Sequence, residues 1–335
     1  MLVYEPDDQT IQVEAGTTLA ELRAVLARNG QIFPLDVADP ATETLAALVA
    51  GAADGPRRLA YGALRDLVLG LTVVECDGTL VRYGAQVVKN VTGYDLVKLM
   101  VGNRDTLGLI VAVSLRVFPR PAQSATIVLD CTTAFSIQHS ASRSTGDFSE
   151  LRSGFARCCE LLDALASTRL QPVAVELLAG SAEAVQLVLK FEGSAAVVAR
   201  HLREIAALAH HYGACIASEH REKEEEQLWQ SILMRRSMVL RPDEVQLRLA
   251  ILPSAVDSLL AHMVDLGAQH RVIWSVDIQA LNGIASLRLR GARAQIGMFQ
   301  EPLLARWQPP SPAINLMRAI KDVFDPVETL SPLSL

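Results

Sequence analysis

The chain has 335 residues, of which half are apolar and a fifth are charged, and its formal net charge is −6. These values are typical of a soluble globular protein long enough for two domains. A nucleic-acid partner is not expected, because phosphate binding normally requires an excess of Lys and Arg. No apolar run is long enough to span a membrane, and the first ten residues do not have the pattern of a secretory signal.

The cysteines and histidines do not form a metal-binding pattern. Five cysteines are scattered along the chain without any CxxC spacing, which favours reduced thiols in the cytosol over a zinc or iron–sulfur site. Cys158 and Cys159 lie in a predicted helix, where packing is the simpler interpretation. His210 and His211 end an apolar helix, where positive charge favours the helix C-terminus. We therefore predict no metal site.

The first 125 residues predict short strands and helices. Ile11–Glu14 alternates apolar and polar residues, as a strand does. Thr18 and Glu21 form a capping box that begins a helix, which Gly30 ends. A run of small residues follows at 44–55.

A hairpin is predicted at residues 70–84, where two strand-like runs flank Asp77 and Gly78. This pair is typical of a tight type I′ turn, in which both central residues have positive φ. A further strand is expected at Val113–Phe118, ended by prolines.

The second half of the chain predicts alternating strands and helices after a polar stretch at 132–153, which we interpret as a surface loop or linker. The expected helices are Phe155–Leu165, Ala195–His211, one that opens at Arg221–Glu226, one between residues 251 and 272, and Pro312–Val323. The expected strands are Pro172–Leu178, Gln186–Phe191, Ala214–Ala217, Val245–Ile251, Val272–Asp277 and Ser286–Arg290. This pattern indicates an α+β domain whose sheet is covered by helices on one face.

Residues 84–118 carry the most specific signal in the chain. They read GAQVVKNVTGYDLVKLMVGNRDTLGLIVAVSLRVF, and an earlier stretch, 55–70, reads GPRRLAYGALRDLVLG. Both resemble the FAD-binding subunit of glycolate oxidase, within the vanillyl-alcohol-oxidase or PCMH-type superfamily of flavoproteins. The similarity runs in register from about residue 3 to 121 and is weak afterwards, apart from the ending at 324–326.

The resemblance implies three regions. Residues 1–125 would form a PCMH-type FAD-binding domain without its first lobe, and residues 126–300 would form an α+β cap or substrate domain with a covered antiparallel sheet. Residues 301–335 would form a C-terminal helix and tail that return to the FAD domain.

The resemblance also implies the residues along FAD. Small residues suit such a site, because backbone N–H groups bind a pyrophosphate only where no side chain keeps it away. Arg58, Lys89 and Tyr94 are weaker candidates, each of which could equally be a structural ion pair or a packed ring. The other expected cofactor residues are Thr44, Ala46, Ala47, Gly55, Gly62, Thr106, Gly108 and Ile110.

Several positions depart from the family pattern. By this resemblance the chain would begin after the lobe that carries the family's glycine-rich loop, either because the gene start is misplaced, because the chain is a fragment, or because the protein has lost the lobe. Ala46 and Ala47 replace paired glycines. Asp105 replaces a glycine. If its carboxylate pointed at the pyrophosphate, the repulsion between the two negative charges at about 4 Å would cost about 4 kcal/mol at an effective dielectric of 20. Residues 331–333 read SPL in place of Asn-Pro-Gly, and no histidine follows His270. These departures suggest relaxed selection on cofactor binding.

Five arginines of the second half are candidates for binding a carboxylate: Arg235, Arg236, Arg288, Arg290 and Arg293. The alternation of Arg288 and Arg290 favours solvent exposure of both. No nucleophile elbow, Rossmann glycine pattern or catalytic residue can be identified.

Two functions remain open at this point. The chain could be the FAD-binding subunit of a glycolate-oxidase-like oxidoreductase of small 2-hydroxy acids, paired with a second flavin subunit and an iron–sulfur subunit. It could instead be a non-catalytic scaffold of that complex, with weak or lost FAD binding. An unrelated α+β binding protein is a third reading. We expect a cytoplasmic location, with attachment to the inner face of the membrane only through partners.

Overall fold

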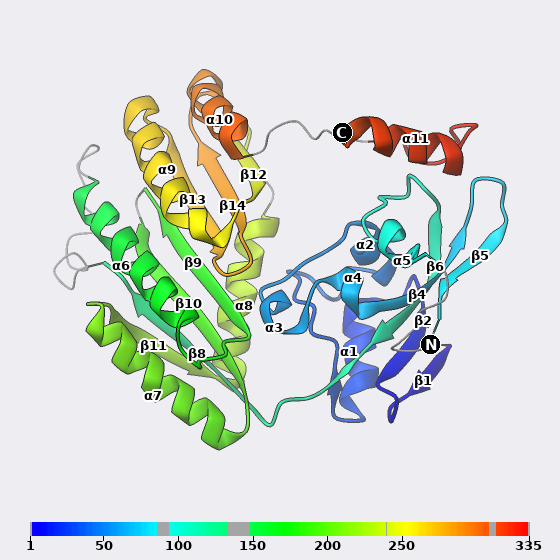
Figure 1. Ribbon diagram of the computed structural model, residues 1–335, viewed down its shortest axis with the longest axis horizontal. Coiled ribbons are helices and arrows are strands. Elements are labelled where there is room, and N and C mark those ends of the chain that lie inside the picture. The colour runs from blue at the N-terminus through cyan, green and yellow to red at the C-terminus, as the bar shows by residue number, and fades with distance from the viewer. Residues whose placement is uncertain are drawn as a thin grey trace. The chain divides into compact units, whose positions relative to one another are not determined.

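The computed structural model describes residues 2–85, 94–132, 148–181, 183–238, 240–307 and 313–333. The chain forms two compact units. Unit 1 comprises residues 1–120 and 310–335, and unit 2 comprises residues 121–309 (Figure 1). The C-terminal residues therefore fold with the N-terminal unit.

Unit 1 is built on a five-stranded sheet with the strand order β1-β2-β6-β4-β5. Its apolar core packs residues of this sheet against helix α1 and the short helices α2, α4 and α5. The strands are β1 (Val3–Glu5), β2 (Thr10–Glu14), β4 (Val68–Val74), β5 (Leu80–Gly84) and β6 (Leu109–Arg116), with β3 (Gln31–Ile32) and β7 (Phe118–Pro119) in a separate pair. The helices are α1 (Leu19–Ala27), α2 (Leu45–Ala50), α3 (Arg58–Tyr61), α4 (Leu64–Leu67), α5 (Val97–Met100) and α11 (Ile314–Phe324).

Local sequence signals determine the start of α1. The Thr18 side chain accepts a hydrogen bond from the Glu21 backbone, and the Glu21 side chain accepts one from the Thr18 backbone. This reciprocal pair satisfies two N–H groups that the helix itself leaves unpaired. The predicted capping box is confirmed, and Gly30 takes a φ of 61° just after the helix.

The predicted hairpin is also confirmed, because β4 pairs antiparallel with β5. The predicted type I′ geometry of its turn is wrong. Among its residues only Gly78 has positive φ (85°), and Glu75 donates its backbone N–H to Thr79, which makes a five-residue connection. The Asp77 carboxylate accepts the Thr79 N–H at 2.8 Å, and this bond favours the wider turn.

Unit 2 contains a seven-stranded sheet with the order β11-β8-β10-β9-β13-β14-β12, in which all neighbouring strands are antiparallel. The strands are β8 (Gln123–Asp130), β9 (Ala174–Gly180), β10 (Glu183–Gly193), β11 (Cys215–Arg221), β12 (Glu244–Ala250), β13 (Ile273–Gln279) and β14 (Ile284–Arg290). The helices are α6 (Ser149–Ala166), α7 (Ala195–His211), α8 (Glu222–Ser237), α9 (Val256–His270) and α10 (Arg293–Trp307).

Helices α6, α7, α9 and α10 lie along one face of this sheet (Figure 1). Helix α8 packs on the other face, where Trp229 and Ile232 meet Val128 and Val188. The apolar side chains of α8 do not cover the β13–β14 part of that face. Polar residues alternate there with buried apolar ones. The sequence pattern had not predicted α8 in this position.

Several boundaries differ from the sequence-based expectation. The units separate at 120/121 rather than near 125, because β8 begins at Gln123 and pairs with β10 and β11. The expected loop at 132–153 is wrong for residues 149–153, which open α6. Residues 133–147 lie outside the described residues. The sequence-based expectation did not include strand β8 or helix α10.

Candidate functional site

The start of helix α2 is the region where the resemblance placed the pyrophosphate. Thr44 caps the helix, and its hydroxyl accepts the N–H of Ala47 at 3.3 Å. The N–H of Ala46 donates to the carbonyl of Ala15 at 2.8 Å. Both amide groups are thus already paired within the protein, which does not fit the expected role of Ala46 and Ala47 as phosphate donors.

The glycines after α2 have structural explanations. A Cβ on Gly55 would lie 2.7 Å from the Asp36 carbonyl oxygen, so only glycine fits this contact. Gly62 ends α3 with a φ of 88°, a conformation that favours glycine. The Arg58 guanidinium lies 3.5 Å from the Asp54 carboxylate, which matches the ion-pair alternative for this residue.

The loop from Asn103 to Gly108 has an unusual backbone. Arg104 and Asp105 are consecutive non-glycine residues with φ of 49° and 59°. Each such residue costs about 1–2 kcal/mol, although Asp tolerates this region better than most. Buried Asn103 holds the loop, since its side chain accepts from Asp105 N and donates to Gly108 O, both at 3.0 Å. The Thr106 hydroxyl and N–H both donate to the Asn103 carbonyl.

Strand β6 begins directly after this loop. Ile110 is buried, while its neighbours Leu109 and Val111 are 47% and 38% exposed. Tyr94 is 96% exposed and therefore does not pack as a ring, and Lys89 lies outside the described residues.

The structure brings two of the predicted segments together. The N–H of Gly102 donates to Val49 O, and that of Arg104 donates to Ala50 O, both at 2.9 Å. The C-terminal end of α2 therefore lies against the loop that leads into β6. Residues 44–50 and 102–111 thus adjoin one another in unit 1, and we call them the α2–β6 region.

The α2–β6 region fits one part of FAD and not another. Exposed aliphatic side chains at Leu109 and Val111 suit an aromatic ring such as adenine. The first-turn amides of α2 do not suit the pyrophosphate, because Ala46 and Ala47 already donate inside the protein. The fit therefore rests on β6 and the loop before it.

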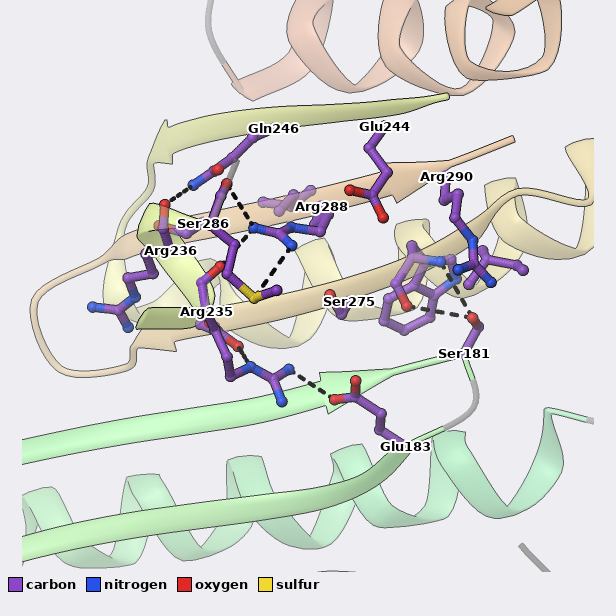
Figure 2. A pocket seen from close by; sticks show the side chains of 15 residues that line it. Ser181, Glu183, Arg235, Arg236, Glu244, Gln246, Ser275, Ser286, Arg288 and Arg290 are labelled. Atoms are coloured by element: carbon purple, nitrogen blue, oxygen red, sulfur yellow. Dashed lines mark hydrogen bonds and ion pairs between the residues drawn. The ribbon is translucent and has the colours of Figure 1, made fainter. Parts of the chain in front are cut away.

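A second site lies in unit 2, on the sheet face that α8 leaves uncovered. A cavity of about 350 Å³ opens between β12, β13, β14 and the C-terminal end of α8 (Figure 2). Four arginines line it: Arg235, Arg236, Arg288 and Arg290. The expectation that Arg288 and Arg290 face solvent is wrong, because both are half-buried in this cavity. Arg293 is exposed at the start of α10, outside the cavity lining.

Two of these arginines are held by carboxylates. The Arg235 guanidinium lies 2.8 Å from Glu183 and 3.2 Å from buried Asp277. Arg236 pairs with Glu176, whose side chain is fully buried. Burial raises the pKa of Asp277, and the nearby guanidinium groups of Arg235 and Arg236 only partly oppose this effect.

The other two arginines have no carboxylate partner among the described residues. Arg288 donates to the carbonyl of Arg235 at 2.7 Å. The Arg290 side chain makes no hydrogen bond or ion pair to any described residue, although Glu244 is its cross-strand neighbour. Figure 2 shows both side chains projecting from β14 on the same side of the sheet. Two guanidinium groups that line one cavity can bind a carboxylate, and the hydroxyl of Ser275 can add a hydrogen bond.

Sequence reasoning missed the acidic and hydroxyl members of this site. Ser275 and Asp277 alternate along β13, and Ser286 and Arg288 alternate along β14. On both adjacent strands, polar residues alternate with apolar ones that face the helices. This pattern could have indicated a polar site on the other face of the sheet.

Within the described ranges, no group of three or more His, Cys, Asp or Glu side chains could hold a metal ion. In the same ranges, no helix is long and apolar enough to cross a membrane. The pKa of the Cys158 thiol, buried in α6, is raised by hydrogen bonding to Cys131 and by burial, so it is not a reactive thiolate.

Comparison with solved structures defines the class of fold. Alkyldihydroxyacetonephosphate synthase superposes with a TM-score of 0.74 over all of this chain and 66% of its own, at 15% identity. The glucooligosaccharide oxidase of Acremonium strictum, a flavinylated protein, gives a TM-score of 0.68 over 97% of this chain and 77% of its own, at 14% identity. The predicted α+β fold is confirmed.

Sequence comparison narrows the resemblance. Residues 1–84 match the FAD binding domain family, so FAD is the indicated cofactor. Glycolate oxidase subunit GlcE of Escherichia coli (strain K12) is 38% identical over 125 residues, 37% of this chain and 36% of that protein. The mitochondrial D-2-hydroxyglutarate dehydrogenase of Bos taurus is 40% identical over 118 residues, 35% of this chain and 22% of that protein.

The alignments span about a third or less of the length of these curated relatives. Within that part, the resemblance to FAD-binding subunits of the glycolate oxidase type is confirmed.

Proposed function

We propose that the chain is an FAD-binding subunit of a glycolate-oxidase-like enzyme that oxidises small 2-hydroxy acids. The observation that carries this proposal is the match of residues 1–84 to the FAD binding domain, together with 38% identity to a glycolate oxidase subunit over 125 residues. When bound, FAD would supply the hydride-accepting group, which no amino-acid side chain provides.

In this proposal unit 1 positions the cofactor. The exposed aliphatic side chains of Leu109 and Val111 would bind the adenine, and the backbone from Thr106 to Ile110 would approach it closely. Thr44, Gly55 and Gly62 would act by fixing the backbone around this region.

Unit 2 would bind the substrate carboxylate. Arg288 and Arg290 would contact it, because neither guanidinium is neutralised by a carboxylate of the described residues. The ion pairs of Arg235 with Glu183 and Asp277 would fix the wall of the cavity.

The carboxylate contact has a direct test. We expect Arg290→Gln to raise the KM for glycolate or D-lactate about tenfold, because a charge-assisted hydrogen bond is worth roughly 1.5–3 kcal/mol. Arg293→Gln, which changes an exposed arginine outside the cavity, should leave KM unchanged. Equal KM values for the two variants would remove the cavity from the proposal.

The scaffold role is the second candidate. The paired amides of Ala46 and Ala47 favour it, since they leave the first turn of α2 without donors for a pyrophosphate. In this role the chain would support a second flavin subunit and an iron–sulfur subunit, and its location would be cytoplasmic, with any membrane attachment made through those partners.

FAD uptake separates the two candidates. The purified chain is mixed with FAD, dialysed, and examined for a flavin spectrum that is released on denaturation. Retained flavin supports the enzyme subunit and excludes a flavin-free scaffold. A colourless chain that still co-purifies with a flavoprotein partner supports the scaffold and excludes the enzyme subunit.

A further inference from the structure

The C-terminal segment of unit 1 makes direct contact with the loop that precedes β6. Lys321 on α11 donates from its ammonium group to the carbonyl of Thr106 at 2.9 Å. The N–H of Ser331 donates to the carbonyl of Asp105 at 3.2 Å. Two consecutive carbonyl groups of the loop are thus held by residues more than 200 positions further along the chain.

The Lys321 contact is buried and charge-assisted. The residue is only 9% exposed, and its ammonium group also pairs with fully buried Asp325. Burial acts to raise the pKa of Asp325, but the hydrogen bonds from Lys321, Leu330 and Thr329 outweigh it and lower the pKa to about 2. Both partners of the ion pair are therefore held in place. The Lys321 ammonium group donates to the Thr106 carbonyl, and the Asp325 carboxylate accepts two backbone N–H groups.

The loop needs such support. Arg104 and Asp105 both have left-handed backbone conformations, which are unfavourable for residues other than glycine. Asn103 stabilises the loop from within, whereas Lys321 and Ser331 stabilise it from outside.

We propose that Lys321, Asp325 and Ser331 form a C-terminal clasp that positions the Asn103–Gly108 loop for the cofactor. Lys321 is a positioning residue and does not itself contact FAD. This inference rests on the proposed FAD binding at Thr106–Ile110, and it adds that α11 sets the affinity of that site.

The test compares Lys321→Met with Lys190→Met, which breaks a partly buried lysine–carboxylate pair in unit 2. FAD affinity is measured by quenching of flavin fluorescence, and amide hydrogen exchange of residues 103–108 is measured without FAD. We expect Lys321→Met to weaken FAD binding about tenfold and to speed exchange in the loop. Lys190→Met should change neither.

A second variant covers the case in which Lys321→Met does not fold. Ser331→Pro removes one donor of the clasp at an exposed position and leaves the buried ion pair intact. It should weaken FAD binding several-fold and speed exchange at the same loop. Wild-type FAD affinity and wild-type exchange in the clasp variants would overturn the clasp alone, whereas a wild-type chain that takes up no FAD would overturn the FAD proposal and the clasp's role with it.

Discussion

Units 1 and 2 bury their polar groups in different ways. In unit 1, buried polar side chains mostly fix turns and loops, and Lys321 and Asp325 are its only buried charged residues among those described. In unit 2, carboxylates are buried in the sheet region itself, at Glu176 and Asp277 on strands and at Glu225 on α8. The family match lies in unit 1, whereas the cavity with unneutralised charge lies in unit 2. The part of the chain that resembles known flavoproteins is therefore not the part that holds the unneutralised arginines.

The largest expected effect tests whether unit 2 depends on its buried charges. Glu225 accepts hydrogen bonds from Ser124 and Thr126 and lies 3.5 Å from the Lys190 ammonium. We expect Glu225→Ala to destabilise unit 2 by about 3–5 kcal/mol, because it removes the shared acceptor of Ser124 and Thr126 as well as one of the two carboxylates near Lys190. Exposed Glu226→Ala is the matched control.

Urea unfolding monitored by tryptophan fluorescence measures this effect in unit 2 alone. All three tryptophans of the chain, at positions 229, 274 and 307, lie in that unit. A loss below about 1 kcal/mol would mean that the sheet-face charges contribute little, and the contrast between the units would weaken.

In unit 1 the backbone should be the sensitive element. Gly84 has a φ of 74°, and a Cβ there would lie 2.3 Å from the Leu69 carbonyl oxygen. Gly84→Ala should cost about 2–4 kcal/mol through strain and overpacking. Gly78→Ala, in the same hairpin, should cost only about 1 kcal/mol, because its φ is positive but nothing lies within 4 Å. Far-UV circular dichroism with urea distinguishes the two, and equal losses would contradict the packing explanation.

One buried carboxylate in each unit should respond to acid, and the two should act in opposite directions. The pKa of Asp325 in unit 1 is lowered to about 2, so the stability it provides is present above pH 4 and is lost as the pH falls from about 4 to 2. Burial raises the pKa of Asp277 in unit 2, so this group becomes less destabilising as the pH falls toward its ordinary pKa of 3.8. Asp325→Asn should flatten the acid dependence of unit 1, measured by hydrogen exchange of β2 and β6, and Asp277→Asn should flatten that of unit 2, measured by tryptophan fluorescence.

The smallest expected effect concerns the cap of α1. Thr18→Ala should destabilise unit 1 by about 1 kcal/mol, because it removes the hydrogen bond to Glu21 N. Thr17→Ala changes the neighbouring residue outside the capping box and should have less effect. The comparison uses the urea midpoint of unit 1, and equal shifts would show that the cap adds no stability.

Features fixed by nearby residues could be predicted from the sequence. The capping box of α1 and the β4–β5 hairpin depend on residues a few positions apart, so their patterns are visible in the chain. The turn type could not be predicted, because the Asp77 side chain bonds to Thr79 and widens the connection.

Features fixed by distant residues could not be predicted in the same way. Alternating Arg288 and Arg290 are compatible with solvent or with a cavity, and only the arrival of the α8 C-terminus decides between them. Similarly, the small residues Ala46 and Ala47 suggested phosphate donors. Their amides already donate to the Ala15 carbonyl and the Thr44 hydroxyl, and Ala15 belongs to a segment well before α2 in the chain.

The insertion of unit 2 between the two parts of unit 1 has a consequence for synthesis. Residues 121–309 are contiguous, so unit 2 can fold as soon as they have left the ribosome. Unit 1 cannot complete its contacts at that stage, because Lys321 joins Thr106 across 215 positions of sequence. The contacts of Lys321 and Ser331 with the Asn103–Gly108 loop therefore form only after the last part of the chain has been made, and a chain stopped before residue 313 would lack both of them.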